Sequence, residues 1–380
     1  MKFPNFSFTL EWNELKKFDK LDISGKKIIF YAENSSSFNH FRLLIDELTN
    51  KLNIPICYVT SIKNDKIFQI NNSKITSFYI GDGAARTKFF LTLKACVLIM
   101  DMPDLERFHI KKSKVYSVCY VYLFHSMFSI HTYLRKGALD DFDVIFCVGP
   151  HHIKEIKEIE NIYNLKQKKL VNYGFGRLDS LLQEKKNYVD KKEKNLVIIA
   201  PTYGKNNLLN ICGMELISIL LDANFQVILR PHYRILNDSK KLISNIKEKF
   251  SQNENFTLET GILNPDDFHL SICMITDWSG IGIEYALTRE NRVIFIDLPQ
   301  KIMNAEFDQI HIDPMEQSIR NKIGHLVSPT NLKSIPKLIQ DENNISDIDV
   351  IRSSIVFNIH ESAQVGSIVL KEILMAQKCN

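Results

Sequence analysis

One short segment, Met274–Glu284, joins an apolar run to the small and polar residues that commonly bind phosphate. The run ends in Thr276-Asp277-Trp278-Ser279-Gly280, where the pattern predicts the start of a helix. The first N–H groups of a helix lack intrahelical partners and lie at the positive end of its dipole, so they attract anions. We therefore expect the donor's pyrophosphate to bind at Thr276, Asp277, Ser279 and Gly280, with hydroxyl donors from Thr276 and Ser279. The alternative is that Asp277 or Ser279 only caps the helix.

A second candidate for anion binding, Arg230-Pro231-His232, directly follows the apolar run Phe225–Leu229. Arg230 offers a planar fork that matches phosphate oxygens, whereas His232 can donate to phosphate or protonate a leaving group. Arg230 could instead pair with a carboxylate across a sheet. Three further residues are expected to support donor binding: Glu284, whose carboxylate could accept from sugar hydroxyls, and Thr202 and Lys205, which follow another apolar run.

A candidate general base, His125, directly follows the apolar run Val118–Phe124. An imidazole can accept a proton from an attacking hydroxyl near neutral pH, as a transferase requires. A buried histidine that is hydrogen-bonded to a loop is an equally good interpretation. The residues that could share a cleft with this site are His131, Arg135 and Arg177.

The elements that must position these residues alternate regularly along the chain. Short apolar runs, read as strands, are separated by helical patterns, and such alternation predicts parallel sheets covered on both faces by helices. The predicted fold class is therefore α/β, with two doubly wound Rossmann-like domains that face a central cleft. The expected strands lie at 27–32, 55–60, 77–80, 95–100, 118–124, 143–148 and 170–173 in the first half and at 196–200, 225–229, 256–258, 274–276 and 292–297 in the second.

Two domains also agree with the length of 380 residues, which exceeds the usual size of one hydrophobic core. A Lys-rich, apolar-poor segment at 184–195 is the predicted linker. It would join an acceptor domain, 1–183, to a nucleotide-donor domain, 196–355. The remaining segment, 356–380, is expected to form a helix that could pack back toward the first domain.

Composition and missing motifs exclude several classes of function. A net charge of +4 is too small to argue for nucleic-acid binding. Neither a signal peptide nor an apolar run long enough to span a bilayer is present, so we expect a cytoplasmic protein. No P-loop, nucleophile elbow or metal-ligand spacing occurs. We therefore expect no metal and no obligatory cofactor, with the diphosphate charge balanced by the basic residues and the helix start.

The chain from about Leu123 onward resembles the CDP-glycerol glycerophosphotransferase family, the teichoic-acid polymerase and primase type of the glycosyltransferase-B architecture. The motifs that carry the resemblance occur in order: His125 in place of the family's His-Gly pair, Gly174-Phe175-Gly176-Arg177-Leu178-Asp179, Ala200-Pro201-Thr202-Tyr203, Arg230-Pro231-His232, Thr276-Asp277-Trp278-Ser279-Gly280 with Glu284, and Phe357-Asn358 with Ser362-Ala363. The departures are Ser126 and Gly176 in place of glycine and proline, Gly280 in place of a second serine, and Ile359-His360-Glu361 in place of Asp-Gly.

The resemblance implies a transferase that moves glycerol phosphate, or a related polyol phosphate, from a CDP-activated donor to a hydroxyl of a cell-surface glycan or lipid-linked precursor. His125 would take the acceptor proton. Arg230, His232 and the helix start at Ser279 would hold the pyrophosphate, and Glu284 the ribose. Ser362 would lie near the cleft. A lipid-linked acceptor would also imply peripheral association with the inner face of the cell membrane.

Three alternatives remain at the level of sequence. An inverting nucleotide-sugar glycosyltransferase of capsule, lipopolysaccharide or other surface-polysaccharide synthesis would use the same fold. A nucleotide-sugar 2-epimerase would need no acceptor. The non-enzymatic alternative is a scaffolding protein of an envelope-assembly complex.

Overall fold

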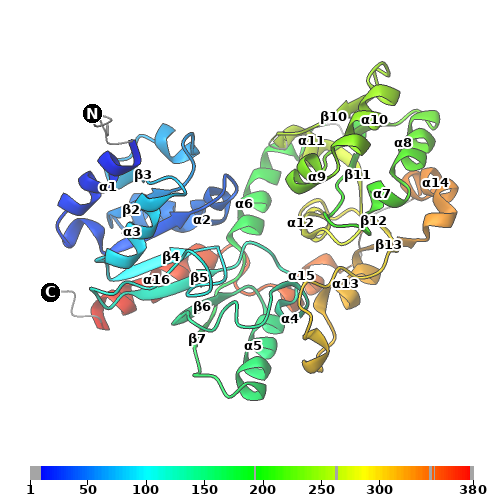
Figure 1. Ribbon diagram of the computed structural model, residues 1–380. Helices are drawn as coiled ribbons and strands as arrows, with labels where there is room; N and C mark the ends of the chain where they lie inside the picture. Colours follow the sequence, from blue (N-terminus) through cyan, green and yellow to red (C-terminus); the bar gives the residue numbers. More distant parts are fainter. Residues whose placement is uncertain (1–9, 192–193, 262–263, 342–344, 346, 377–380) are drawn as a thin grey trace, which may run out of the picture. The chain divides into compact units, whose positions relative to one another are not determined.

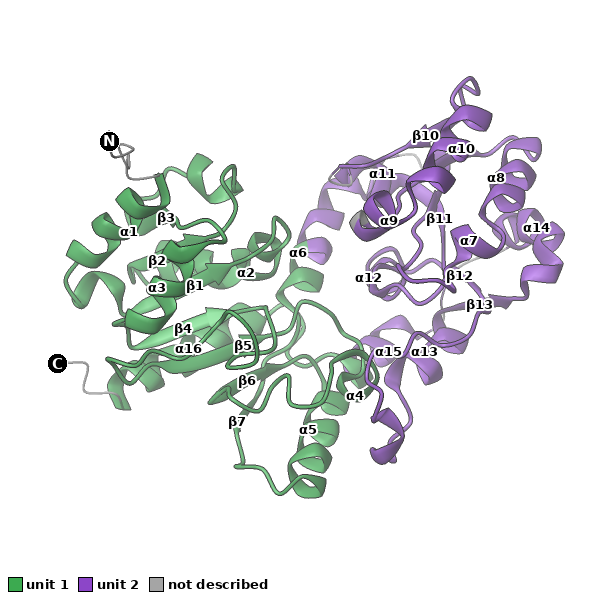
Figure 2. Ribbon diagram, viewed as in Figure 1, with its two compact units in different colours: residues 1–180, 354–380 green, residues 181–353 purple. Residues whose placement is uncertain are grey.

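The computed structural model describes residues 10–191, 194–261, 264–341, 345 and 347–376. The chain forms two compact units (Figure 2). Unit 1 comprises residues 1–180 and 354–380, and unit 2 comprises residues 181–353. Each unit contains one parallel β-sheet with helices packed against it (Figure 1), so the α/β fold class predicted from the alternating pattern is confirmed.

The sheet of unit 1 has seven parallel strands in the order β3-β2-β1-β4-β5-β6-β7. Its strands are β1 (Ile28–Ala32), β2 (Ile56–Thr60), β3 (Ile75–Tyr79), β4 (Val97–Met100), β5 (Cys119–Leu123), β6 (Val144–Cys147) and β7 (Lys169–Asn172). Its helices are α1 (Leu10–Lys20), α2 (Ser37–Asp46), α3 (Ala84–Thr92), α4 (Ile130–Tyr133), α5 (Pro150–Ile162) and α16 (Ser362–Ala376), and α6 (Gly176–Lys185) continues into unit 2.

Strand β1 shows why the central strands of this sheet are continuously apolar. Side chains alternate between the two faces of a strand, so Phe30 packs against Phe41 of α2 while Tyr31 packs against Phe90 of α3. All five residues of β1 are buried. A sheet covered on both faces needs apolar residues at every position, and this is the pattern that identified the strands.

The last helix, α16, belongs to unit 1 although it follows unit 2 in sequence. Val369, Leu370 and Ile373 join the same hydrophobic core as α2 and the central strands. A Cβ at Gly366 would lie 2.7 Å from the Tyr173 ring, so the absence of a side chain there permits close packing. The C-terminal segment therefore completes the first core.

The sheet of unit 2 has six parallel strands in the order β10-β9-β8-β11-β12-β13. Its strands are β8 (Lys194–Ile199), β9 (Gln226–Leu229), β10 (Phe256–Leu258), β11 (Ser271–Thr276), β12 (Val293–Ile296) and β13 (Gly324–Val327). Its helices are α7 (Leu208–Ile211), α8 (Gly213–Asp222), α9 (Tyr233–Asp238), α10 (Lys240–Phe250), α11 (Pro265–Leu270), α12 (Gly280–Arg289), α13 (Met315–Ile323), α14 (Ile335–Gln340) and α15 (Ile348–Ile355), whose last residues lie in unit 1.

The boundary between the units does not coincide with the predicted linker, 184–195. The chain leaves unit 1 between Ser180 and Leu181, inside α6, and that helix continues to Lys185 before a 3-10 turn, Lys186–Tyr188. The Lys-rich composition of the segment is compatible with an exposed helix end, which is why it resembled a linker. Residues 192–193 of this segment, 1–9 of the first predicted domain and 377–380 of the last lie outside the described residues.

Within the described parts of the chain, no helix is long and apolar enough to cross a membrane.

Candidate functional site

The start of α12 lies where the sequence predicted an anion site. Ser279 occupies the N-cap position in an extended conformation, but its side chain makes no capping hydrogen bond to the helix. Ser279 and Gly280 are both half-buried. Gly282 lets α12 approach β11 closely, because a Cβ there would lie 2.7 Å from the Thr276 methyl group. The geometry therefore leaves the Ser279 hydroxyl unused by its own helix at the carboxyl end of β11.

Asp277 organises this region rather than capping α12. Its buried carboxylate accepts the N–H groups of Thr202 at 2.7 Å, Leu208 at 2.9 Å and Trp278 at 2.7 Å. Burial raises the pKa of Asp277, and the three N–H donors oppose that effect. The alternative in which Asp277 caps α12 is wrong, because the carboxylate instead connects the loop after β8 to the end of β11.

Thr276 also points into the protein. Its hydroxyl is fully buried and donates to the backbone oxygen of Ala200 at 2.6 Å. A hydroxyl has only one proton to donate, and that of Thr276 is already used. The expected hydroxyl donor from Thr276 is therefore not available, and this residue supports the site by joining β11 to the end of β8.

Arg230 and His232 follow β9 as predicted, and each has a protein partner. The Nε atom of Arg230 lies 3.7 Å from a Glu259 carboxylate oxygen, so the carboxylate pairing considered from the sequence is present. His232 accepts the N–H of Arg234 at Nδ1, at 3.2 Å, and so caps α9. Burial, followed by the charges of Lys301 and Arg234, lowers the pKa of His232 to about 4. At neutral pH this imidazole is uncharged and carries its proton on Nε2.

A basic cluster around the Tyr203 ring was not predicted. The Lys301 ammonium lies over this ring and donates to Thr202 Oγ1 at 3.2 Å. The Arg234 guanidinium lies 4.6 Å from the centre of the same ring, and the His232 ring is also 4.6 Å away. Lys301 follows β12, so the strand-end rule that selected Arg230 could have found it. Lys205, in contrast, is exposed, and no described contact connects it to this cluster.

Glu284 lies on α12, half-buried, just over one turn from Gly280. A hydrogen bond from a sugar hydroxyl to the Glu284 carboxylate stays a prediction.

In unit 1, His125 directly follows Phe124 at the end of β5. Its Nδ1 lies 3.0 Å from the backbone oxygen of Asp101. A carbonyl can only accept, so Nδ1 carries the proton and Nε2 is left as an acceptor. Burial lowers the pKa of His125, with a further contribution from His40, which keeps the imidazole neutral. A neutral ring with an acceptor nitrogen is the form that a general base requires.

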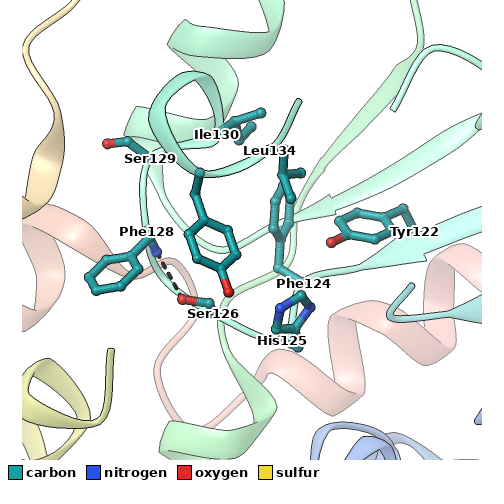
Figure 3. A pocket seen from close by; sticks show the side chains of 9 residues that line it. Tyr122, Phe124, His125, Ser126, Phe128, Ser129, Ile130 and Leu134 are labelled. Atoms are coloured by element: carbon teal, nitrogen blue, oxygen red, sulfur yellow. Dashed lines mark hydrogen bonds between the residues drawn. The ribbon is translucent and has the colours of Figure 1, made fainter. Parts of the chain in front are cut away.

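A small pocket lies beside His125 (Figure 3). Figure 3 shows the aromatic side chains of Tyr122, Phe124 and Phe128 around His125 and Ser126. The Ser126 hydroxyl accepts the N–H of Phe128 at 3.3 Å, which closes the turn after β5. The residues that line the pocket are Tyr122, Phe124, His125, Ser126, Phe128, Ser129, Ile130, Tyr133 and Leu134.

Two neighbours of His125, Asp101 and His40, were not predicted from the sequence. Asp101 is buried at the end of β4, where its carboxylate accepts the hydroxyl of Ser37 and Nδ1 of His40, both at 2.9 Å. The His40 ring centre lies 6.0 Å from that of His125. Asp101 follows a predicted strand directly, so its position was a usable signal. His40 lies on a helix and gave none.

Two residues predicted to line the cleft, His131 and Arg135, contact other side chains of unit 1. His131 is 2% exposed, its Nδ1 lies 2.9 Å from a Glu155 carboxylate oxygen, and it is not among the pocket-lining residues. Arg135 is exposed, pairs with Asp104 at 3.2 Å and packs over the Phe108 ring. The expectation that His131 lines a cleft with His125 is wrong, because the chain turns at α4 and directs the imidazole into the protein.

Arg177 and Ser362 lie at the start of α6 and of α16, respectively. Arg177 is half-buried. Ser362 is fully buried, and both its hydroxyl and its N–H donate to the Asp179 carboxylate, which also accepts the N–H of His360 at 2.8 Å. Gly174 has φ +105°, and a Cβ there would meet the backbone of Phe357. This motif therefore fastens the C-terminal segment to unit 1, and a cleft role for Ser362 is not supported.

The structure thus brings two groups of predicted residues together, each within one unit. Thr202, His232 and Asp277 gather with Lys301 at the carboxyl ends of neighbouring strands in unit 2, and the start of α12 and Arg230 follow the same edge. His125 and Ser126 lie together in unit 1. Among the described residues, no group of three or more histidine, cysteine or acidic side chains could hold a metal ion.

Comparison with known proteins identifies a family and a fold. A family model described as CDP-glycerol:poly(glycerophosphate) glycerophosphotransferase matches residues 15–298. No curated protein sequence matches the chain. Two similar solved structures are the wall teichoic acid polymerase TagF with CDPG, at 13% identity and TM-score 0.59 over 97% of this chain and 94% of that one, and the UDP-GlcNAc 2-epimerase of Methanocaldococcus jannaschii, at 14% identity and TM-score 0.57 over 91% and 99%. At such identities these two show a shared fold of two parallel-sheet α/β domains.

Proposed function

The chain belongs to the CDP-glycerol:poly(glycerophosphate) glycerophosphotransferase family and is a transferase, and we propose that it moves glycerol phosphate from CDP-glycerol to a hydroxyl of a cell-surface glycan or its lipid-linked precursor. In this reaction the acceptor oxygen forms a bond to the phosphorus that carries glycerol. The bond from that phosphorus to the bridging oxygen breaks, and CMP leaves with the electron pair. The acceptor proton passes to the enzyme.

His125 is the proposed proton acceptor, and its hydrogen bond to Asp101 is the observation that carries this assignment. Nδ1 donates its proton to the backbone oxygen of Asp101, so Nε2 of the neutral ring carries no proton and its lone pair can accept one. The lowered pKa of His125 keeps this nitrogen unprotonated at neutral pH. General-base catalysis of this kind typically contributes a factor of about 10²–10⁴ to the rate.

Unit 2 is the proposed donor domain, and unit 1 the proposed acceptor domain. The start of α12, with the Ser279 hydroxyl and its first N–H groups, would bind the diphosphate together with Arg230. His232 would donate a hydrogen bond from Nε2 rather than transfer a proton, because its pKa of about 4 leaves the free protein with a neutral imidazole. CMP is a stable anion, so its departure needs charge stabilisation more than protonation. Glu284 would accept from the ribose.

We further propose that the protein acts in the cytoplasm and reaches lipid-linked acceptors at the inner face of the membrane as a peripheral protein. Co-sedimentation with vesicles that contain the acceptor lipid, compared with vesicles that lack it, measures this. Binding that depends on the acceptor supports the proposal, and equal absence of binding to both contradicts it.

Release of CMP from labelled CDP-glycerol tests the reaction. The folded protein should release CMP only when a glycan or lipid-linked acceptor is present, and the label should appear in the acceptor as glycerol phosphate. Glycosyl transfer from a nucleotide sugar would instead indicate a glycosyltransferase, and conversion of a nucleotide sugar without acceptor would indicate an epimerase. Failure to release CMP with every acceptor, from protein that binds CDP-glycerol, contradicts the proposal.

A further inference from the structure

Lys301 is a basic residue at the candidate donor site that none of the sequence motifs includes. It lies on the segment after β12, half-buried, with its ammonium over the Tyr203 ring and in contact with the Thr202 hydroxyl at 3.2 Å. Arg234 and His232, which come from the segment after β9, pack around the same ring. Three basic side chains from two segments therefore converge on one aromatic ring.

The place where they converge is the topological switch point of the unit 2 sheet. From β8 the chain proceeds to β9 on one side, and the later strands β11 and β12 lie on the other. Ligands of open α/β sheets bind beyond the carboxyl ends of the strands at this point. Tyr203 follows β8, so its ring and the cluster lie at the edge where the diphosphate is expected.

Burial of the Lys301 side chain makes its ammonium costly in the free protein. Burial is the main cause that lowers its pKa to about 7, and the neighbouring Arg234 adds to this. His232 packs on the same Tyr203 ring but is uncharged at neutral pH, so it adds no positive charge beside Lys301. Asp277 favours the ammonium, but its carboxylate already accepts three N–H groups. A dianion bound beside Lys301 would offset the cost of the buried positive charge.

We propose that Lys301 binds the diphosphate of the nucleotide donor, and that binding of the donor is accompanied by uptake of one proton onto its amine. The inference rests on the proposed function, because it assigns the donor's diphosphate to this site. It adds a donor-binding residue and makes donor affinity depend on pH.

The protonation state of Lys301 in the free protein determines how the affinity for CDP-glycerol depends on pH. At pH 8 most Lys301 side chains are neutral, since their pKa is about 7, and the diphosphate would draw a proton onto each. Below pH 6 the amine is already charged, so Lys301 would take up no proton. Both phosphates of CDP-glycerol are esterified and do not titrate near neutrality, so the ligand itself contributes no proton. The affinity for CDP-glycerol should therefore fall as the pH rises above 7.

Calorimetric titration of the full chain with CDP-glycerol at pH 8 tests the inference, with the experiment repeated in two buffers of different ionisation enthalpy. The wild-type protein should take up close to one proton per bound ligand. Lys301→Met should abolish this uptake and weaken binding about 10- to 100-fold, the size of a lost charge-assisted contact. Lys301→Arg should keep most of the affinity without proton uptake, because arginine is always charged. The exposed Lys241→Met is the matched control and should behave as wild type.

Different results would overturn the role of Lys301 and the proposed function. If wild type binds CDP-glycerol without proton uptake, or if Lys301→Met binds as tightly as wild type, the role of Lys301 is overturned while the proposed function stands. If folded wild type does not bind CDP-glycerol at all, both are overturned. Lys301→Arg is the control for misfolding. If folded Lys301→Met loses affinity and Lys301→Arg retains it, the loss comes from the missing positive charge.

Discussion

The two units place their chemistry at the same structural position but prepare it in opposite ways. In unit 1 one imidazole, His125, is held in a fixed tautomer by the backbone of Asp101 beside an aromatic pocket. In unit 2 the basic side chains of Lys301, Arg234 and His232 surround Tyr203, and the Asp277 carboxylate accepts three N–H groups. In the proposed reaction, unit 1 therefore supplies a proton acceptor and unit 2 supplies basic groups for the diphosphate.

The strand-end rule of α/β sheets therefore locates a site without defining its chemistry. Both sheets are parallel, and both carry their candidate residues after the carboxyl ends of strands. In both units burial lowers the pKa of a histidine, but the consequence differs. A lowered pKa gives His125 a free acceptor nitrogen, whereas in His232 the acceptor nitrogen is used by Arg234.

The largest expected effect comes from removing the base of unit 1. His125→Ala should reduce kcat of CMP release about 10³-fold, within the range of general-base catalysis, because no acceptor nitrogen remains at the end of β5. The affinity for CDP-glycerol should not change, since donor binding is assigned to unit 2. Single-turnover kinetics and calorimetry measure the two quantities separately. A variant that loses donor affinity and keeps its turnover would contradict the division of roles between the units.

Arg230 provides the next largest effect and separates a phosphate ligand from a structural ion pair. Arg230→Gln should weaken CDP-glycerol binding about 10- to 100-fold, as expected for loss of a charge-assisted hydrogen bond. Its partner supplies the matched control, because Glu259→Gln removes the same ion pair and retains the guanidinium. Glu259→Gln should bind the donor at least as tightly as wild type. Equal loss of affinity in the two variants would show that Arg230 acts only through its ion pair.

The pH profile of kcat/KM tests the same difference, because titration of one essential group changes kcat/KM by about tenfold per pH unit. The rate should fall as the pH decreases through the pKa of His125, which lies below its ordinary value of 6.5, because protonation removes the acceptor. It should also fall above about pH 7, where free Lys301 loses its proton. Lys301→Arg should remove the alkaline fall and leave the acidic one. A profile in which both falls survive this substitution would contradict the assignment of one limb to each unit.

The sequence predicted the architecture well because parallel strands buried on both faces must be apolar throughout. β13 shows the limit of that signal: it lies at the edge of its sheet, begins at Gly324 and leaves Leu326 41% exposed. An edge strand with one exposed face needs no continuous apolar run, so the pattern did not reveal it.

The candidate site was only partly predictable, because residue type and strand-end position do not specify partners. Thr276 ends β11 and Asp277 follows it, as predicted, but their polar atoms are satisfied by other loops. His131 illustrates the same limit, since nothing in the sequence connects it to Glu155, which lies in a later helix. His40 was missed for the converse reason, because only the folded chain brings this helical residue beside His125. Lys301 follows β12, so its position was a usable signal, but only the folded chain places it over Tyr203.

The smallest effect is expected at Ser362, and it distinguishes a residue that stabilises the fold of unit 1 from one that takes part in catalysis. Ser362→Ala removes one donor from the buried Asp179 carboxylate and should reduce the free energy of unfolding by about 1–2 kcal/mol. Two donors to this carboxylate remain, the N–H groups of His360 and of residue 362 itself. Urea unfolding measures the loss, and kcat and the affinity for CDP-glycerol should stay at wild-type values. A large loss of turnover in a variant that is still folded would return Ser362 to the active site, and would mean that the start of α16 contributes to the chemistry of unit 1 as well as to its core.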